Sequence, residues 1–315
     1  AKGICILLVV LFHFGYLEEF PAIQAMRMPL YFILSGLFYK DYESILSFMI
    51  RKINRLVIPF LFFGAISLIF LTRGSLTAIK YHLIEPFIKP SIINLPIWFL
   101  LCLFWVNLIY RCLSALTHKT WVKCSVVIII GVLGRTLSYY HIYLPLFISS
   151  AFSAMPFYFI GILFRKLPIL YKTGKDNLYL GISLFFMAGA ILYCRYFNTP
   201  HLETLTNIYT GSMIEIYLIS VVLVIGLLLL CKAIRWIPII SYLGRYSIIV
   251  LGFHYFYETL LLSYFTEPSH NWRLNFTINT FEALLLTLLF CWISIPFCRK
   301  FIPFFTAQTD LIKRS

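Results

Sequence analysis

KGICILLVVLFH, from Lys2 to His13, has the pattern of an apolar helix that ends in a single imidazole, and MPLYFILSG, from Met28 to Gly36, follows it closely. Lys2 and His13 are eleven residues apart. At about 100° per residue, a helix returns such a pair to within about 20° of the same face, about 16 Å apart along the axis. A basic group at the membrane edge would therefore share a helix face with an ionisable group near the middle of the bilayer.

The composition is that of a membrane protein. Of the 315 residues, 61% are hydrophobic and 12% are charged, and the mean hydropathy is +0.89, which excludes a soluble globular domain. Apolar segments recur as far as about Arg299, without a linker that could tether a separate module. We therefore expect an all-α polytopic fold with one transmembrane domain over residues 1–315. The first apolar run is shorter than a full span, so we expect a truncated N-terminus.

Apolar windows of near-spanning length predict about ten transmembrane helices in one bundle. The expected spans lie at about 1–17, 26–40, 56–72, 96–113, 121–136, 147–165, 177–197, 212–231, 243–265 and 276–298. Between the second and third spans, residues 41–56 mix apolar and basic side chains. This mixture is typical of a basic helix that lies in the membrane interface.

The basic residues are distributed as membrane orientation requires. The formal net charge of +14 would suggest nucleic acid in a soluble protein, but here the charges are divided among short loops, so we expect no nucleic-acid partner. With a cytoplasmic N-terminus, 19 of the 26 Lys and Arg fall in cytoplasmic segments, and the other 7, including Arg27, fall in the opposite loops. We therefore expect both termini to be cytoplasmic.

Two intramembrane histidines are the first candidates for chemistry. An ionisable side chain near mid-membrane is costly and by default faces a cavity or partner, which favours a functional His13 over a structural one. His254 lies at a similar depth in the ninth expected span, and Glu258, one turn further on, could orient or charge it. An acidic residue at the outer interface is an equally good interpretation of Glu258. We expect ordinary surface roles for five histidines in or near loops: His82, His118, His141, His201 and His270.

A second candidate is a basic cluster at the expected cytoplasmic mouth of the bundle. It comprises Arg51, Lys52 and Arg55, with Lys2 and Arg245 as further members. Guanidinium and ammonium groups fixed at such a mouth suit contacts with phosphates. A simple positive-inside anchor would have the same sequence, so the cluster alone leaves both interpretations open.

Several short motifs follow one another along the chain, and together they resemble one family. They are Lys2–His13 (a basic residue, ten others, then histidine), Met28–Gly36 (MPLYFILSG), Lys52–Pro59 (KINRLVIP), Ile97–Leu100 (IWFL), Pro156–Gly161 (PFYFIG), and Leu243–Ser247 (LGRYS) followed by His254. In this order they resemble the acyltransferase 3 family of integral membrane acyltransferases, and particularly its fucose 4-O-acetylase-like branch. The chain departs from the family at Gly252 and Phe253, where a larger apolar pair usually precedes the late histidine.

The resemblance implies a membrane-bound O-acyltransferase. A cytoplasmic acyl-CoA, usually acetyl-CoA, would give its acyl group to a hydroxyl of a sugar or cell-surface glycan, free or lipid-linked. The chain would lie in the bacterial plasma (inner) membrane and modify polysaccharide of the cell envelope. His13 would act as general base for the acceptor hydroxyl or, alternatively, as the acylated nucleophile, with His254 and Glu258 as further catalytic candidates. No metal is implied.

The resemblance also gives the remaining candidates a role. The basic cluster would bind the CoA phosphates, and the thioester arm would extend inward from Lys2 to His13, a distance of about 16 Å that pantetheine can span. Tyr31 and Ser35 could line the acceptor or the oxyanion, although a serine beside Gly36 also fits plain helix packing.

Two other classes of protein remain open. A transporter or flippase for a lipid-linked sugar would also use intramembrane histidines, kinked helices and a basic mouth, although the two halves of the chain have no obvious inverted repeat. A structural or assembly subunit would leave His13 and His254 without a role. Acyl transfer and acceptor translocation separate these classes experimentally.

Overall fold

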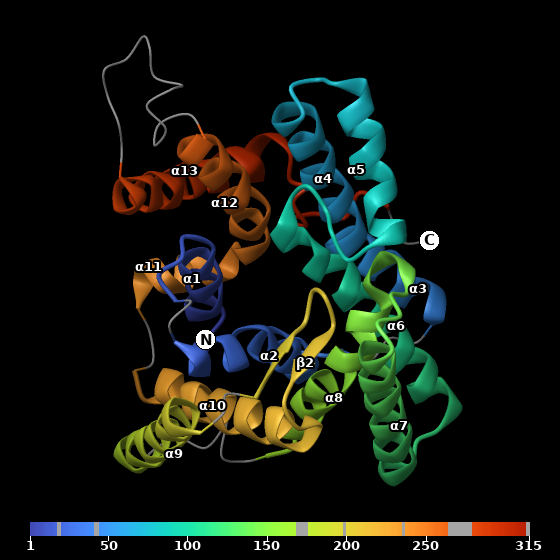
Figure 1. The fold of residues 1–315 in the computed structure, drawn as a ribbon, viewed down its shortest axis with the longest axis vertical. Coiled ribbons are helices and arrows are strands. Elements are labelled where there is room, and N and C mark those ends of the chain that lie inside the picture. Colours follow the sequence, from blue (N-terminus) through green and yellow to red (C-terminus); the bar gives the residue numbers. More distant parts are fainter. Residues whose placement is uncertain are drawn as a thin grey trace.

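The structure, a computed structural model, is built mostly of helices around one extended apolar core (Figure 1). It describes residues 1–17, 20–40, 44–167, 176–197, 200–234, 237–263 and 279–312. Within these residues, seven helical stretches are long and apolar enough to cross a membrane: Ile45–Leu71, Leu95–Leu116, Thr120–Tyr139, Pro145–Phe164, Asn177–Tyr196, Met213–Ile234 and Thr280–Phe301. Two shorter apolar helices carry the candidate histidines.

The elements of the first half are α1 (Lys2–His13), α2 (Pro21–Leu37), α3 (Ile45–Lys52), the π-helical turn η1 (Ile53–Val57), α4 (Ile58–Leu71), α5 (Leu76–Ile88), the 3₁₀ turn η2 (Leu95–Ile97), α6 (Trp98–Leu116), α7 (Thr120–Tyr139), the 3₁₀ turn η3 (Pro145–Phe147) and α8 (Ile148–Phe164). The second half contains α9 (Asp176–Tyr196), β1 (His201–Glu203), β2 (Ile208–Thr210), α10 (Met213–Ile234), α11 (Pro238–Arg245), α12 (Ser247–Leu261) and α13 (Thr280–Phe301).

The predicted helical class is confirmed, because each of the ten expected spans overlaps a helix of the structure. Seven of the helical stretches have the length and apolarity of a span, whereas α1, α2 and α12, with 12, 17 and 15 residues, are shorter. The number of crossings and the side on which the termini lie therefore stay predictions. The helix α5 and the β1–β2 hairpin were not predicted.

The basic segment 41–56 is helical from Ile45 onward. Ser44 caps α3 by accepting a hydrogen bond from the backbone N–H of Ser47, and α3 continues through η1 into α4. Ile45 is exposed at the start of α3, whereas Phe48 is buried. Residues 41–43 lie outside the described residues, and an interfacial position for the segment stays a prediction.

The helices α2 and α8 cross closely because each has a glycine at the contact. A Cβ atom on Gly36 would overlap the carbonyl oxygen of Tyr158, and a Cβ atom on Gly161 would overlap that of Ile33. Small residues allow such approaches between helices in membranes. The crossing fixes the helix that carries the MPLYFILSG run.

Glycines also bring the two histidine helices into place. Gly3 of α1 packs against Gly244 of α11, where a Cβ atom on either residue would overlap backbone atoms. Gly252 of α12 lies against the ring of Phe63 in α4, which a larger side chain would not permit. The departure from the family pattern at Gly252 therefore has a packing reason in this chain.

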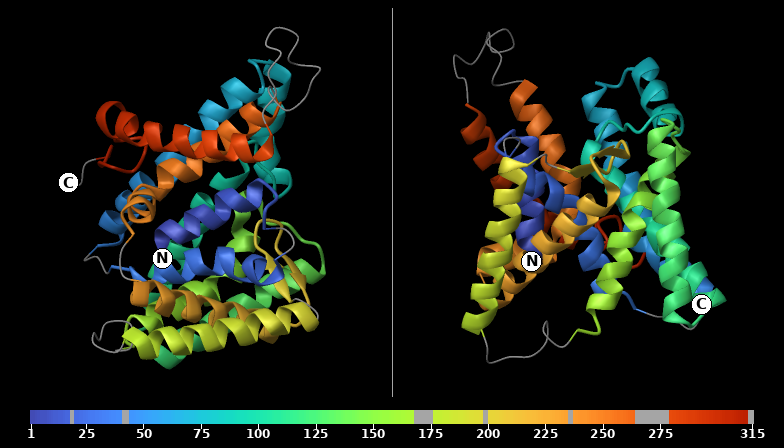
Figure 2. Two further views of the ribbon diagram at one scale, coloured as in Figure 1. Left: turned by 90° about the vertical axis from the view of Figure 1, so that its left-hand side faces the viewer. Right: turned by 60° about the horizontal axis from the view of Figure 1, so that its bottom comes forward.

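The chain ends and the hairpin lie at opposite ends of the bundle. Figure 2 shows the N- and C-terminal ends toward one end and the β1–β2 hairpin toward the other. The helix α1 runs between them, with Lys2 near the chain ends and His13 near the hairpin (Figures 1 and 2).

Candidate active site

His13 and His254 meet inside the bundle. His13 is the last residue of α1, and His254 lies in the middle of α12. Their ring centroids are 5.4 Å apart, with 53° between the ring planes, and the ring of Tyr255 lies 5.3 Å from that of His13. The structure therefore brings together the two histidines that the sequence placed at similar depths.

The proton on His254 is fixed by the backbone of its own helix. The side chain is completely buried, and its Nδ1 lies 2.9 Å from the carbonyl oxygen of Val250. Because a carbonyl can only accept, Nδ1 carries the proton and Nε2 of the neutral ring is an acceptor. Nε2 has no hydrogen-bond partner among the described residues. The helix α12 thus presents a buried imidazole with an unused lone pair.

Glu258 is also buried, one turn further along α12. Its Oε2 has no hydrogen-bond partner in the described part of the chain. His254 donates its orienting hydrogen bond to the carbonyl oxygen of Val250 and not to this carboxyl group. A catalytic role for Glu258 stays a prediction.

A cavity of about 300 Å³ lies beside His13, and we call it the hairpin cavity because the β1–β2 hairpin forms part of its wall. Its polar side chains are His13 from α1, Gln24, Arg27 and Tyr31 from α2, His201 and Glu203 from β1, and Thr204 directly after β1. His201, for which the sequence suggested an ordinary surface role, thus lies in the wall of the cavity. Trp98, at the start of α6, adds an aromatic surface. The cavity thus combines two imidazoles, one positive and one negative side chain, and several aromatic rings.

Arg27 is a site residue that the sequence analysis missed, because it was counted among the loop charges. It lies in the second turn of α2, and its Cζ is 3.4 Å from the ring centroid of Phe12, a cation–π contact. Its charge interacts with His13 and with Glu203. An ionisable residue within an apolar helix was the available signal, the same one that marked His13.

A smaller cavity of about 130 Å³ lies next to the first, and we call it the N-terminal cavity. Lys2 of α1 lines it, together with Ser35 of α2 and Ser247 at the start of α12. Ser35 therefore faces a cavity, while the neighbouring Gly36 makes the packing contact with α8.

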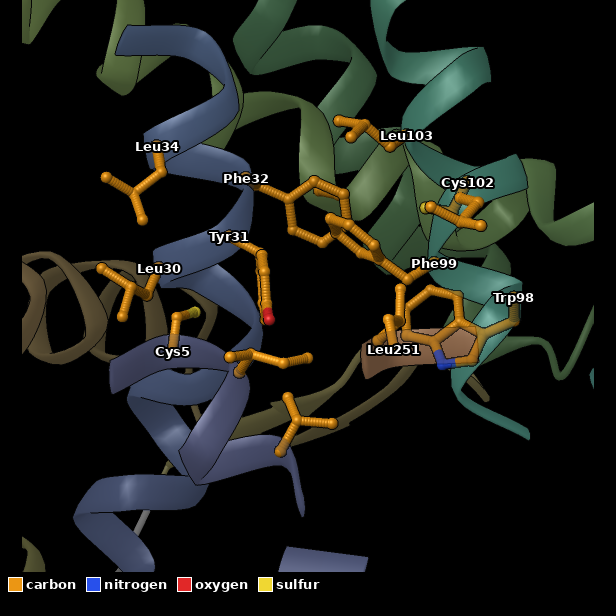
Figure 3. Close-up of a cluster of buried hydrophobic side chains, with 14 of the residues drawn as sticks. Cys5, Leu30, Tyr31, Phe32, Leu34, Trp98, Phe99, Cys102, Leu103 and Leu251 are labelled. Atoms are coloured by element: carbon orange, nitrogen blue, oxygen red, sulfur yellow. The ribbon is translucent and has the colours of Figure 1, made fainter. Parts of the chain in front are cut away.

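Tyr31, Phe99 and Leu251 line both cavities and therefore lie between them; we call these three residues the divider. They converge from α2, α6 and α12 (Figure 3). The rings of Tyr31 and Phe99 are 5.0 Å apart. Tyr31, which we predicted to line the acceptor, thus lies at the boundary between the two cavities.

Of the five basic residues of the expected phosphate site, Lys2 is the one that lines the N-terminal cavity. Two other lining residues stand close in sequence to further members of the cluster. Leu56 directly follows Arg55, and Ser247 comes two residues after Arg245, which is exposed.

Arg51 and Lys52 form the last turn of α3. Their positive charges interact, and Nζ of Lys52 lies 5.3 Å from the ring centroid of Phe48. Both cations thus stand directly before the π-helical turn that leads into α4.

The C-terminal segment, residues 302–312, contacts Arg55. The Nη1 group of Arg55 donates a hydrogen bond to the carbonyl oxygen of Ala307, and its Nη2 lies 3.5 Å from a carboxylate oxygen of Asp310. Arg55 therefore already has an anionic partner in this structure.

Asn54 holds the same C-terminal segment. It is completely buried, and its Nδ2 donates to the carbonyl oxygen of Ile312 over 2.9 Å. Its Oδ1 accepts hydrogen bonds from the backbone N–H groups of Leu311 and Ile312, over 3.0 and 2.9 Å. The turn that carries Arg55 is thus fixed by residues at the far end of the chain.

Another titratable cluster lies on α5, away from both cavities. Nδ1 of His82 and Nζ of Lys89 lie 2.7 and 2.9 Å from the two carboxylate oxygens of Glu85. Burial would raise the pKa of Glu85, but hydrogen bonds from Lys89 and His82 outweigh it, and the pKa lies below its ordinary value. These groups satisfy one another, so we assign them no chemistry.

The geometry around His13 suits proton transfer in a water-poor site. A histidine at the wall of a cavity can take a proton from a bound hydroxyl, and a second imidazole beside it can orient it or share its charge. Groups that act in such surroundings interact more strongly than they would in water.

The motifs and the two histidines occur in a chain that matches a known family. The family model for an acyltransferase domain, acyltransferase 3, matches residues 1–297. Comparison with curated proteins and with solved structures gave no match. Because the family model covers nearly the whole chain, the chain belongs to the acyltransferase 3 family and is a membrane acyltransferase.

Proposed function

We propose that the chain transfers an acyl group, in particular acetyl, from acyl-CoA to a hydroxyl of a sugar or glycan. The observation that carries the proposal is the position of His13, which lines the hairpin cavity and packs beside His254. Lys2, at the other end of the same helix, lines the N-terminal cavity. The short helix α1 thus places Lys2 and His13 in cavities on opposite sides of the divider.

In this proposal the donor binds at the N-terminal cavity. Its phosphates would contact Lys2 and the basic cluster Arg51, Lys52, Arg55 and Arg245, since such groups match phosphate oxygens. From Lys2 to His13 the helix rises about 16 Å, the distance that the pantetheine arm would cover. The phosphate at Arg55 would share or replace the contact that Asp310 now makes.

His13 would act as the general base. It takes the proton of the acceptor hydroxyl while the oxygen forms the new ester bond to the thioester carbonyl carbon. The carbon–sulfur bond breaks, and the sulfur receives the proton from the imidazolium, so the products are the acylated sugar and free CoA thiol. His254 would steady His13 through their contact. In the alternative, the His13 nitrogen attacks the thioester carbonyl carbon, the carbon–sulfur bond breaks and CoA leaves, and the acceptor hydroxyl then displaces the imidazole to form the ester.

The acceptor would approach from the hairpin side. The hairpin cavity offers polar side chains and the Trp98 ring, the combination that binds polar ligands with apolar faces. With cytoplasmic termini, this side would face away from the cytoplasm of a bacterial inner membrane. A cell-surface glycan, free or lipid-linked, is then the acceptor class, and the fucose 4-O-acetylase-like branch is the subgroup that we favour. The proposal involves neither a metal nor nucleic acid.

Acetyl transfer with labelled acetyl-CoA tests the proposal. Membranes containing the native chain should move label into glycan, and His13→Ala should reduce the rate by about 10²- to 10⁴-fold, the usual size of a general-base contribution. His118→Ala, at an exposed histidine outside both cavities, is the matched control and should keep the native rate. Native rates in His13→Ala would exclude the mechanism.

Vesicles prepared from the same membranes also test the transporter alternative. Translocation of a labelled lipid-linked sugar without any acetylation would favour a flippase over an acyltransferase. Mass spectrometry of surface glycans from cells with and without the gene would then identify the acceptor and the acyl group together.

A further inference from the structure

The β1–β2 hairpin is anchored to two helices. Its strands pair antiparallel, with Leu202 opposite Tyr209 and Glu203 opposite Ile208. Arg135 of α7 donates a hydrogen bond to the carbonyl oxygen of Tyr209 over 3.3 Å and also lies over its ring. The hairpin is therefore held in place by contacts with the helices.

The turn of the hairpin is fixed as well. Asn207 has a positive φ of 58°, which asparagine tolerates well, and its Nδ2 donates to the carbonyl oxygen of Gly134 over 3.0 Å. The Ser153 hydroxyl donates to Asn207 Oδ1 over 2.5 Å, and the Ser150 hydroxyl donates to the carbonyl oxygen of Leu205 over 3.0 Å. These contacts hold the hairpin rigidly against the hairpin cavity.

This framework presents Glu203 to the cavity opposite Arg27. Among the described residues that line the hairpin cavity, Arg27 is the basic residue of the Lys or Arg type and Glu203 is the acidic residue. Their opposite charges therefore balance. They attract each other, yet they form no ion pair in the described part of the chain. Arg27 Nε has no hydrogen-bond partner among the described residues. The wall of the cavity thus holds an unused donor on Arg27 and the carboxylate of Glu203, an exposed residue.

We propose that Glu203 and Arg27 form the acceptor subsite, that it takes a single neutral sugar residue, and that Glu203 selects which hydroxyl faces His13. The inference rests on the proposed function and adds the class of acceptor and the residue that recognises it.

The chemistry of the cavity favours a neutral polyhydroxyl ring. Hydroxyls donate to the Glu203 carboxylate and accept from the Arg27 guanidinium, both charge-assisted contacts. The apolar face of the ring packs on Trp98. A neutral ring can satisfy Glu203 and Arg27 at once, whereas a carboxylate or phosphate placed beside Glu203 would be repelled. The cavity, at about 300 Å³, is at the small end of the range for ligand pockets, which suits one sugar residue better than a longer chain.

The test uses the full chain in liposomes, labelled acetyl-CoA, and methyl glycosides of neutral hexoses, of 6-deoxyhexoses and of the matching uronic acids. The native chain should acetylate neutral glycosides in preference to uronates. Glu203→Gln should raise the KM for the neutral acceptor at least tenfold and leave the KM for acetyl-CoA within twofold. Glu215→Gln, an exposed carboxylate at the start of α10 outside both cavities, should behave as native.

A charge reversal gives a readout that misfolding cannot imitate. Glu203→Lys should lose the preference for neutral glycosides and gain transfer to the uronates. An unchanged acceptor KM in Glu203→Gln, or a native preference for uronates, would overturn the subsite while His13-dependent transfer still stood. Transfer that is absent throughout, or that is equal in native chain and His13→Ala, would instead count against the proposed function.

Discussion

The imidazole rings of His13 and His254 lie 5.4 Å apart, although one belongs to α1 and the other to α12. The contact exists because Gly3 and Gly244 let α1 pack closely on α11, which leads directly into α12. A pair of imidazoles in such a position can hold one proton between them or direct one another.

The second histidine can be tested without disturbing the packing. His254→Phe keeps a ring of similar shape in the buried site but removes both nitrogens. We expect a kcat at least about tenfold lower, equivalent to about 1.4 kcal/mol of barrier, at an unchanged melting temperature. Steady-state kinetics and thermal unfolding in detergent measure the two quantities. A native kcat would show that His254 only fills space.

The divider should set the size of the acyl group. Leu251→Ala widens the boundary between the cavities, so we expect the ratio of butyryl to acetyl transfer to rise about tenfold, the usual effect of one or two methylene groups on selectivity. Leu261→Ala removes a buried leucine from the same helix away from both cavities and should leave the ratio unchanged. Equal ratios in the two variants would place the acyl path elsewhere.

Asp310 should compete with the donor for Arg55. Asp310→Asn removes the carboxylate charge 3.5 Å from the guanidinium, and the KM for acetyl-CoA should fall about two- to fivefold, as expected for a partly exposed ion pair. Initial rates at several acetyl-CoA concentrations measure the effect. A higher KM would mean that Asp310 positions Arg55 for the donor instead of competing with it.

The crossing of α2 and α8 should be sensitive to a single methyl group. Gly36→Ala places a Cβ atom against the carbonyl oxygen of Tyr158, and such overpacking typically costs about 1–3 kcal/mol. We expect a lower melting temperature in detergent. The matched control is Gly181→Ala in α9, where a Cβ atom meets nothing within 4 Å, and it should keep or slightly raise the melting temperature.

The helices were predictable because their signal is local. The run 120–139, for example, is apolar for many consecutive residues and can satisfy its backbone only as a helix in a membrane. His13 and His254 were found for the same reason, since an ionisable residue within an apolar run is visible without any alignment.

The rest of the site depends on contacts between distant residues. The strands of the hairpin have three residues each, and their anchors Gly134 and Ser153 lie far back in the chain. Asn54 and Ile312 are 258 positions apart. Arg27 and Glu203 become a pair only when α2 and the hairpin meet across a cavity, so no local pattern could assign them to one subsite.

Tyr31, Phe99 and Leu251 also bear on the energetics of the host membrane. A continuous water-filled channel through such a helix bundle would conduct protons and dissipate the transmembrane proton gradient. In the described part of the chain, the boundary between the cavities is made of two aromatic rings and one aliphatic side chain, none of which carries a charge. In the proposed function, the acyl arm of the donor would displace these side chains and they would close behind it, so acyl transfer would cross the bilayer while its electrical insulation is kept.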